Sequence, residues 1–223
     1  ICVACNGDII LVTNGVYEAI DTQGKTLAIR SVNGAYETVI DGGNFSRCAK
    51  LGTDLQEESA TLTGFTLRNG YCYGSGAGVW GGYLSECVVT GNMVRGSGGG
   101  AAQATLSNCV LGYNTSDQNG GGADSCLMTN CIVRNNFANG YGGGAYGGTL
   151  VKCLIADNQS DDSGGGAYDA TLTDCEIAWN TSGYRGGGIC WGTLTRCIVF
   201  ENTASEGGGA ASGVLYDCAI IGN

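Results

Sequence analysis

Residues 98–114 read Gly-Gly-Gly-Ala-Ala-Gln-Ala-Thr-Leu-Ser-Asn-Cys-Val-Leu-Gly-Tyr-Asn, and this pattern recurs about every 22 residues from residue 60 onward. Seven cysteines mark the period: Cys87, Cys109, Cys131, Cys153, Cys175, Cys197 and Cys218. An asparagine stands five residues after each of them: Asn92, Asn114, Asn136, Asn158, Asn180, Asn202 and Asn223. A third column closes each Gly-rich run: Gly100, Gly122, Gly144, Gly166, Gly188 and Gly209. Three columns in one register indicate a repeat architecture.

One unit combines Gly-Gly-Gly-Ala, then Thr-Leu-x-x-Cys-x-aliphatic-x-x-Asn, then a short polar stretch. Apolar residues alternate over short runs, and no apolar pattern of helical period persists, which indicates strands and turns. Such a unit suits one coil of a β-helix, because each coil must bend back over itself. We therefore predict an all-β fold: a right-handed, single-stranded parallel β-helix, or solenoid, of about ten coils with Cys, Asn and Gly ladders. At about 4.8 Å per coil, the rod would be roughly 48 Å long.

We expect one β-helix domain over residues 1–223, with irregular opening coils over 1–59 and regular repeats over 60–223. Five columns are expected to point inward and form the core. They are the Ala101 series, the small residues from Gly82 to Gly213, the leucines from Leu84 to Leu215, the cysteine ladder, and the aliphatic residues from Val89 to Ile220.

Each ladder has a physical cause. A side-chain amide can donate to the Asn of one neighbouring coil and accept from the other, and Asn also tolerates a left-handed corner. Gly marks a bend where the backbone has positive φ or approaches another strand closely. In-register cysteines have Cβ atoms about 4.8 Å apart, beyond the roughly 3.5–4.5 Å of a relaxed disulfide. We therefore expect reduced, buried thiols that fill the core, and an outward position for Cys190.

The alternation of Gly-Gly-Ala with x-x-Asn resembles the repeats of polymorphic outer membrane proteins, which are autotransporter-type bacterial surface adhesins, and of other right-handed β-helix repeat proteins. Residues 7–12 (Gly-Asp-Ile-Ile-Leu-Val), 15–17 and 25–29 are similar to the opening coils of the pectate-lyase-like superfamily. Together the two resemblances cover nearly the whole chain. They imply a β-helix at an extracellular or cell-surface location. The Phe of the adhesin repeats is aliphatic here, as at Val89 and Leu111, so the architecture transfers better than the adhesin role.

Composition excludes several functions. The chain has no His, so imidazole bases, Ser-His-Asp triads and most zinc sites are excluded. Its net charge of −10 argues against nucleic acid or an anionic membrane surface as a partner. No apolar run reaches about 18 residues, so we expect no membrane insertion in this segment.

Two groups of polar side chains could carry chemistry on the outside. Asp157, Asp161 and Asp162 are either solvated turn carboxylates or a calcium site, and no other cofactor is expected. A lyase would need that calcium together with Arg185 as the base. A Thr-x-Thr array resembles the ice-binding face of some β-solenoid antifreeze proteins: Thr61 and Thr63, Thr105 and Ser107, Thr171 and Thr173, Thr193 and Thr195.

An aliphatic column follows the cysteine ladder by one residue. If the cysteines point inward, strand alternation sends this column outward, where a contiguous apolar stripe marks an interface. A bend could instead place it inside, and the sequence leaves both readings open. The column contains Val88, Val110, Ile132, Leu154 and Ile198.

The leading hypothesis is a non-enzymatic extracellular structural or adhesive β-helix, acting as a stalk, an adhesin segment or a filament subunit. Its partner would be a further copy, bound end to end or laterally, or a host or cell-surface glycan or protein. The alternative is a polysaccharide-binding or polysaccharide lyase-like protein, and a remote alternative is ice binding. Because the sequence stops within a unit at Asn223, we expect either a segment of a longer polypeptide or a subunit whose ends are covered by neighbours.

Overall fold

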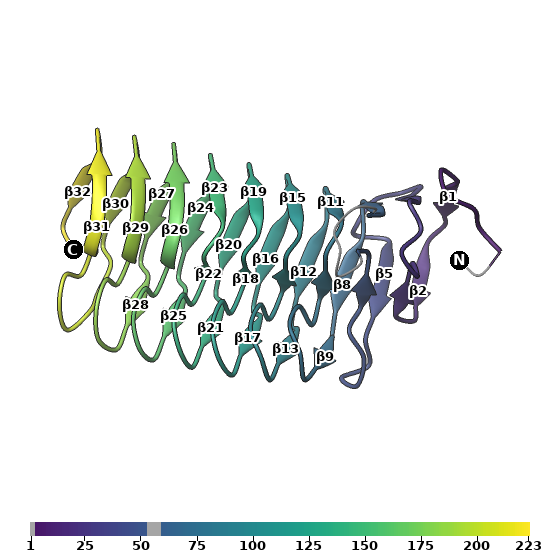
Figure 1. Cartoon of the computed structure of the whole chain (residues 1–223), viewed down its shortest axis with the longest axis horizontal. Helices are drawn as coiled ribbons and strands as arrows, with labels where there is room; N and C mark the ends of the chain where they lie inside the picture. Colours follow the sequence, from purple (N-terminus) through teal and green to yellow (C-terminus); the bar gives the residue numbers. More distant parts are fainter. Residues whose placement is uncertain (1–2, 53–58) are drawn as a thin grey trace.

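The computed structural model describes residues 3–52 and 59–223. Within these ranges the chain forms short strands and turns that stack as coils along one axis, from the N-terminal to the C-terminal end (Figure 1). No helix there is long and apolar enough to cross a membrane. All strand pairs are parallel and join neighbouring coils, as in Val88↔Val110↔Ile132. The predicted all-β parallel solenoid is confirmed.

In residues 3–52 and 59–223, three sheets, named A, B and C, run along the rod. Sheet A has 16 strands in two columns that merge in its last three strands. Its first column contains β1 (Ile9–Val12), β4 (Ala28–Ser31), β7 (Thr61–Thr63), β11 (Tyr83–Ser85), β15 (Thr105–Ser107), β19 (Leu127–Thr129) and β23 (Thr149–Val151). Its second column contains β3 (Ile20–Asp21), β6 (Ala49–Lys50), β10 (Val79–Trp80), β14 (Ala101–Ala102), β18 (Ala123–Asp124) and β22 (Ala145–Tyr146). Both columns continue into β26 (Ala167–Thr173), β29 (Ile189–Thr195) and β31 (Ala210–Tyr216).

The other two sheets each form one column. Sheet B contains β2 (Gly15–Tyr17), β5 (Thr38–Asp41), β8 (Thr66–Arg68), β12 (Val88–Thr90), β16 (Val110–Gly112), β20 (Ile132–Arg134), β24 (Leu154–Ala156), β27 (Glu176–Ala178), β30 (Ile198–Phe200) and β32 (Ala219–Ile221). Sheet C contains β9 (Tyr71–Cys72), β13 (Met93–Val94), β17 (Thr115–Ser116), β21 (Phe137–Ala138), β25 (Gln159–Ser160) and β28 (Thr181–Ser182). The ten strands of sheet B bound about nine turns, close to the ten coils expected.

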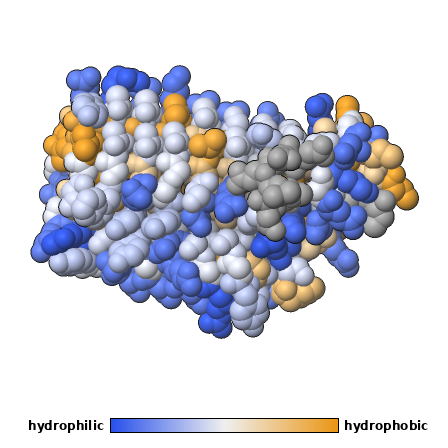
Figure 2. Space-filling model, in the orientation of Figure 1, coloured by the Kyte–Doolittle hydropathy of each residue, from blue (hydrophilic) through white to orange (hydrophobic). Residues whose placement is uncertain are grey.

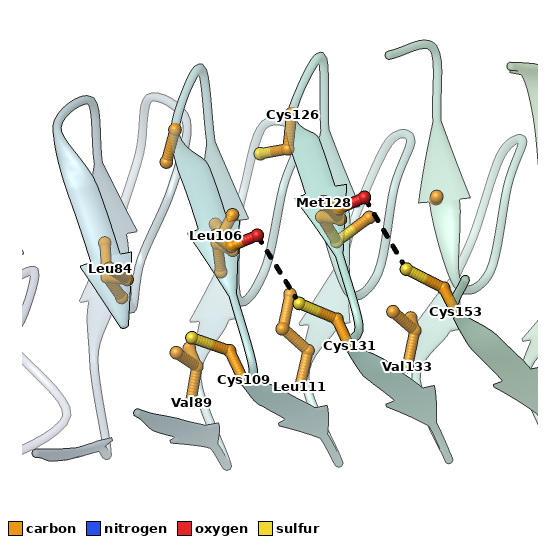
Figure 3. Close-up of a cluster of buried hydrophobic side chains, with 14 of the residues drawn as sticks. Leu84, Val89, Leu106, Cys109, Leu111, Cys126, Met128, Cys131, Val133 and Cys153 are labelled. Carbon is orange, nitrogen blue, oxygen red and sulfur yellow. Dashed lines mark hydrogen bonds between the residues drawn. The ribbon is translucent and has the colours of Figure 1, made fainter. Parts of the chain in front are cut away.

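The core consists of the predicted inward columns. Leu106, Leu111 and Cys109 lie within one coil and are almost fully buried, as are their counterparts in the neighbouring coils (Figure 3). The small column opposite leaves room for them, since Ala104, Cys126 and Ala170 are buried as well. In the last described coil the same columns are less covered, and Leu215 is 39% exposed.

The Asn ladder is continuous and hydrogen-bonded as predicted. The Asn136 side-chain amide donates to Asn158 Oδ1 at 2.9 Å, and its own Oδ1 accepts from the Asn114 amide at 3.0 Å. Each ladder amide also donates to a main-chain carbonyl of the preceding coil, as Asn136 does to Leu111 at 3.1 Å. The buried side-chain amides of the ladder are thereby hydrogen-bonded to one another and to the main chain.

The Asn ladder begins at Asn92, and the coil before it contacts Asn92 through a backbone N–H and a thiol in place of a ladder asparagine. Gly70 stands one coil before Asn92, and its N–H donates to Asn92 Oδ1 at 2.7 Å. The buried Cys48 thiol donates to the same oxygen at 3.4 Å. A Cβ on Gly70 would contact Asn92 Oδ1 at 2.7 Å, so this coil has no room for a ladder side chain.

The left-handed corners do not fall on the ladder asparagines. Positive φ occurs one residue earlier, at 59° for Tyr113 and 54° for Trp179. The ladder side chain must point inward to reach its neighbours, so the residue before it takes the corner. The expected role of Gly144 is confirmed as close approach, because a Cβ there would lie 2.5 Å from the carbonyl oxygen of Gly166.

Candidate functional site

The aliphatic column after the cysteine ladder faces outward on sheet B, which decides between the two readings. Val88, Val110 and Leu154 are half-buried, while Ile132 is 37% and Ile198 48% exposed. The members stand in register on β12, β16, β20, β24 and β30, with Glu176 of β27 between Leu154 and Ile198. We call these five aliphatic residues the sheet B stripe.

Small residues and a single arginine lie beside the sheet B stripe on β16, β20, β24 and β27. Gly112, Ala156 and Ala178 occupy the outer position two residues further along their strands, and all three are buried. Arg134 stands in register with Gly112 and Ala156. The outer face of β16, β20 and β24 therefore carries one charged side chain, on a chain whose net charge is −10.

The hydroxyl array lies on the outer face of sheet A. Thr149, Thr171 and Thr193 stand in register, and Thr173 pairs with Thr195. The array is interrupted by apolar side chains, including Val151 and Leu127, which is 55% exposed. Figure 2 shows a face with pale and blue surface along the rod and orange apolar patches at both of its ends. Ice binding thus stays a prediction that a measurement of thermal hysteresis would check.

A tyrosine cluster lies beside sheet A, and the sequence pattern placed Tyr146 and Tyr168 on the outside but did not bring Tyr141 to them. Tyr146 and Tyr168 stand in register and their rings stack at 5.7 Å, while Tyr141 stacks on Tyr168 at 4.5 Å. Burial, followed by the electrostatic effect of Cys190, raises the pKa of Tyr168. Tyr146 and Tyr168 share a sequence column, but only the loop path brings Tyr141 against them.

Cys190 stands next to Tyr168 in this outward column, yet its side chain is only 1% exposed. The expectation of an accessible thiol is therefore wrong. The backbone before β29 folds back over it, so that a Cβ on Gly186 would lie 2.9 Å from Cys190 Cβ. Burial raises the pKa of the Cys190 thiol.

The three aspartates do not gather into a metal site. Asp157 occupies a left-handed corner before β25, whereas Asp161 and Asp162 follow that strand. Asp162 Oδ1 accepts a hydrogen bond from the neighbouring Ser163 hydroxyl at 2.9 Å. Over residues 3–52 and 59–223, no group of three or more Cys, Asp or Glu side chains could hold a metal ion. Arg185, the residue that a lyase would need as its base, is ion-paired with Glu206 at 2.7 Å.

No family model matches the sequence, and no curated protein matches it. Among solved structures, the crystal structure of pectate lyase Pel9A is similar over 90% of this chain and 56% of that chain, with a TM-score of 0.43 and 14% identity. ORF18 of Geobacillus virus E2 is similar over 92% of this chain and 51% of that chain, with a TM-score of 0.43 and 13% identity. The chain spans about half the length of each of these structures.

Proposed function

We propose that this chain is a non-enzymatic structural element of an extracellular or cell-surface assembly: a rigid β-solenoid rod that associates laterally with another copy through the sheet B stripe. The rod's stiffness would come from the ladders, and its adhesion from the stripe. The observation that carries the proposal is the outward, in-register position of Val110, Ile132 and Leu154 on a nearly uncharged face.

Two physical arguments favour a second copy as the partner. A chain with a net charge of −10 repels its copies least where its surface carries little charge. A second rod also has the same axial spacing of about 4.8 Å between side chains, so its aliphatic residues can fit between those of the first over several coils. A contiguous apolar stripe of this kind is typical of an interaction surface.

Replacing Ile132 with Glu is expected to weaken self-association at least tenfold, because each copy would bring a new negative charge into an apolar contact. The fold should tolerate the change, since Glu176 already occupies the same column two coils later. Sedimentation velocity over a concentration series measures the effect.

Leu127→Glu is the matched control. Leu127 is exposed and aliphatic, and it lies in the same coil as Ile132 but on the outer face of sheet A. This variant should associate as the wild-type chain does. Equal weakening by both variants, or a wild-type chain that is monomeric at all concentrations, would contradict the proposal.

The tyrosine cluster favours a second candidate, polysaccharide binding, because partly exposed, stacked aromatic rings can contact sugars. A panel of acidic glycans tests binding. Incubation with polygalacturonate and calcium, followed by ultraviolet absorbance of unsaturated uronate, tests lyase activity. No binding and no absorbance change would rule out both polysaccharide functions, and the structural role would be the one candidate left.

A further inference from the structure

The thiols of the cysteine ladder have nearly identical surroundings. Cys131, Cys153 and Cys197 each donate to a carbonyl 25 residues earlier at 3.6 Å and to one two residues earlier at 3.4 Å. Cys87 and Cys175 make the same two bonds within 0.2 Å. Repeated contacts require a repeated side-chain rotamer. Figure 3 shows the sulfur atoms of Cys109, Cys131 and Cys153 pointing in the same direction.

A constant rotamer makes the distance between neighbouring sulfurs equal to the coil spacing, about 4.8 Å. This separation is too long for a disulfide. It matches a cation held between two thiolates in a straight line, because two metal–sulfur bonds of about 2.3 Å span about 4.6 Å. Thiolates are the ligands that soft cations prefer. A pair of cysteines differs from the groups of three or more ligands that are absent from the described residues.

We propose that the cysteine ladder is a binding site for soft, two-coordinate d10 cations, with one cation between two neighbouring thiolates. Binding of Hg(II) follows Hg²⁺ + 2 R–SH → Hg(SR)₂ + 2 H⁺. Two S–H bonds break, two Hg–S bonds form, two protons leave to solvent, and nothing is oxidised or reduced. The product is neutral, so an apolar interior tolerates it far better than an unpaired thiolate. Cations would enter through local opening of the coils.

If each cation needs two neighbouring thiols, the number of cations bound depends on which cysteine of the ladder is removed. Thiols that bind singly would lose the same amount at every position. Seven cysteines in a row form three separate neighbouring pairs. Removing Cys153, the fourth member, leaves two runs of three cysteines and room for only two pairs. Removing Cys131, the third member, leaves runs of two and four, which still hold three pairs.

The experiment titrates the reduced chain with mercuric chloride. It follows the ultraviolet charge-transfer absorbance of the thiolates and the protons released. Relative to wild type, Cys153→Ala should bind one Hg(II) fewer and release two protons fewer, whereas Cys131→Ala should bind the same number. Cys126→Ala removes a buried thiol outside the ladder and is the matched control for a lost core side chain, with no ladder site lost. Zinc chloride should not produce the same uptake, because zinc prefers four tetrahedral ligands.

Circular dichroism during the titration shows whether the fold is retained, and Cys153→Val and Cys131→Val replace the alanine variants if those do not fold. Equal losses for the variants at positions 131 and 153 would overturn the proposal, because the thiols would then act singly. Uptake that leaves the ladder thiols free to react after denaturation, or uptake that occurs only once the whole chain has unfolded, would overturn it too.

Discussion

Asn136→Ala is expected to lower the free energy of unfolding by about 3–5 kcal/mol. The Asn136 amide donates to Leu111 and Asn158, and its Oδ1 accepts from both the side chain and the backbone N–H of Asn114. Alanine removes four hydrogen bonds and leaves buried groups on both neighbouring coils without those partners. Each such loss costs about 1–3 kcal/mol when water cannot enter, although the neighbours can partly rearrange. Urea unfolding followed by circular dichroism measures the change.

Asn139→Ala is the control for this variant. Asn139 lies three residues later in the same coil and is exposed. Its replacement should change the free energy of unfolding by less than about 0.5 kcal/mol. Similar effects for the two variants would mean that the Asn ladder does not hold the coils together.

Gly144→Ala is expected to have the second large effect, a destabilisation of several kcal/mol or failure to fold. An added Cβ would lie 2.5 Å from the carbonyl oxygen of Gly166 and 3.0 Å from the Asn158 side chain. The first neighbour is main chain and cannot rotate away, so two coils would have to separate and weaken the ladder beside them. Yield of soluble protein and thermal unfolding report the outcome.

Gly112→Ala provides the comparison. Gly112 lies on the outer face of sheet B, and a Cβ there would meet its nearest atom, the carbonyl oxygen of Arg134, at 3.4 Å. We expect a change within about 1 kcal/mol, because the contact is ordinary and strand residues lose less entropy than Gly on folding. If Gly112→Ala were as damaging as Gly144→Ala, close packing between neighbouring turns would not explain why the Gly-rich turn recurs from coil to coil.

The coil, its length and its inward columns could be predicted from the sequence because the repeat places the same residue type in the same surroundings many times. The position of Asn136 in a ladder follows from its period, whereas the direction of Ile132 stayed open in the sequence, because a bend after Cys131 could have turned it inward. The predicted features depend on local geometry, which the repeat reports directly.

Other features depend on the path of the loops between strands, which the repeat pattern does not predict. Cys190 stands in an outward column but is covered by the backbone of its own preceding turn. Tyr141 reaches the ring of Tyr168 in the next coil through a loop whose sequence varies from coil to coil. Asp157 and Asp161 are close in sequence, but a corner and a strand separate them.

Electron microscopy of the chain over a concentration series, with Ile132→Glu and Leu127→Glu beside wild type, shows whether rods associate through sheet B. We expect straight rods that lie side by side in pairs as the concentration rises. Ile132→Glu should abolish these pairs, and Leu127→Glu should retain them. Single rods at every concentration, or pairs that persist in Ile132→Glu, would contradict a structural element that associates through sheet B.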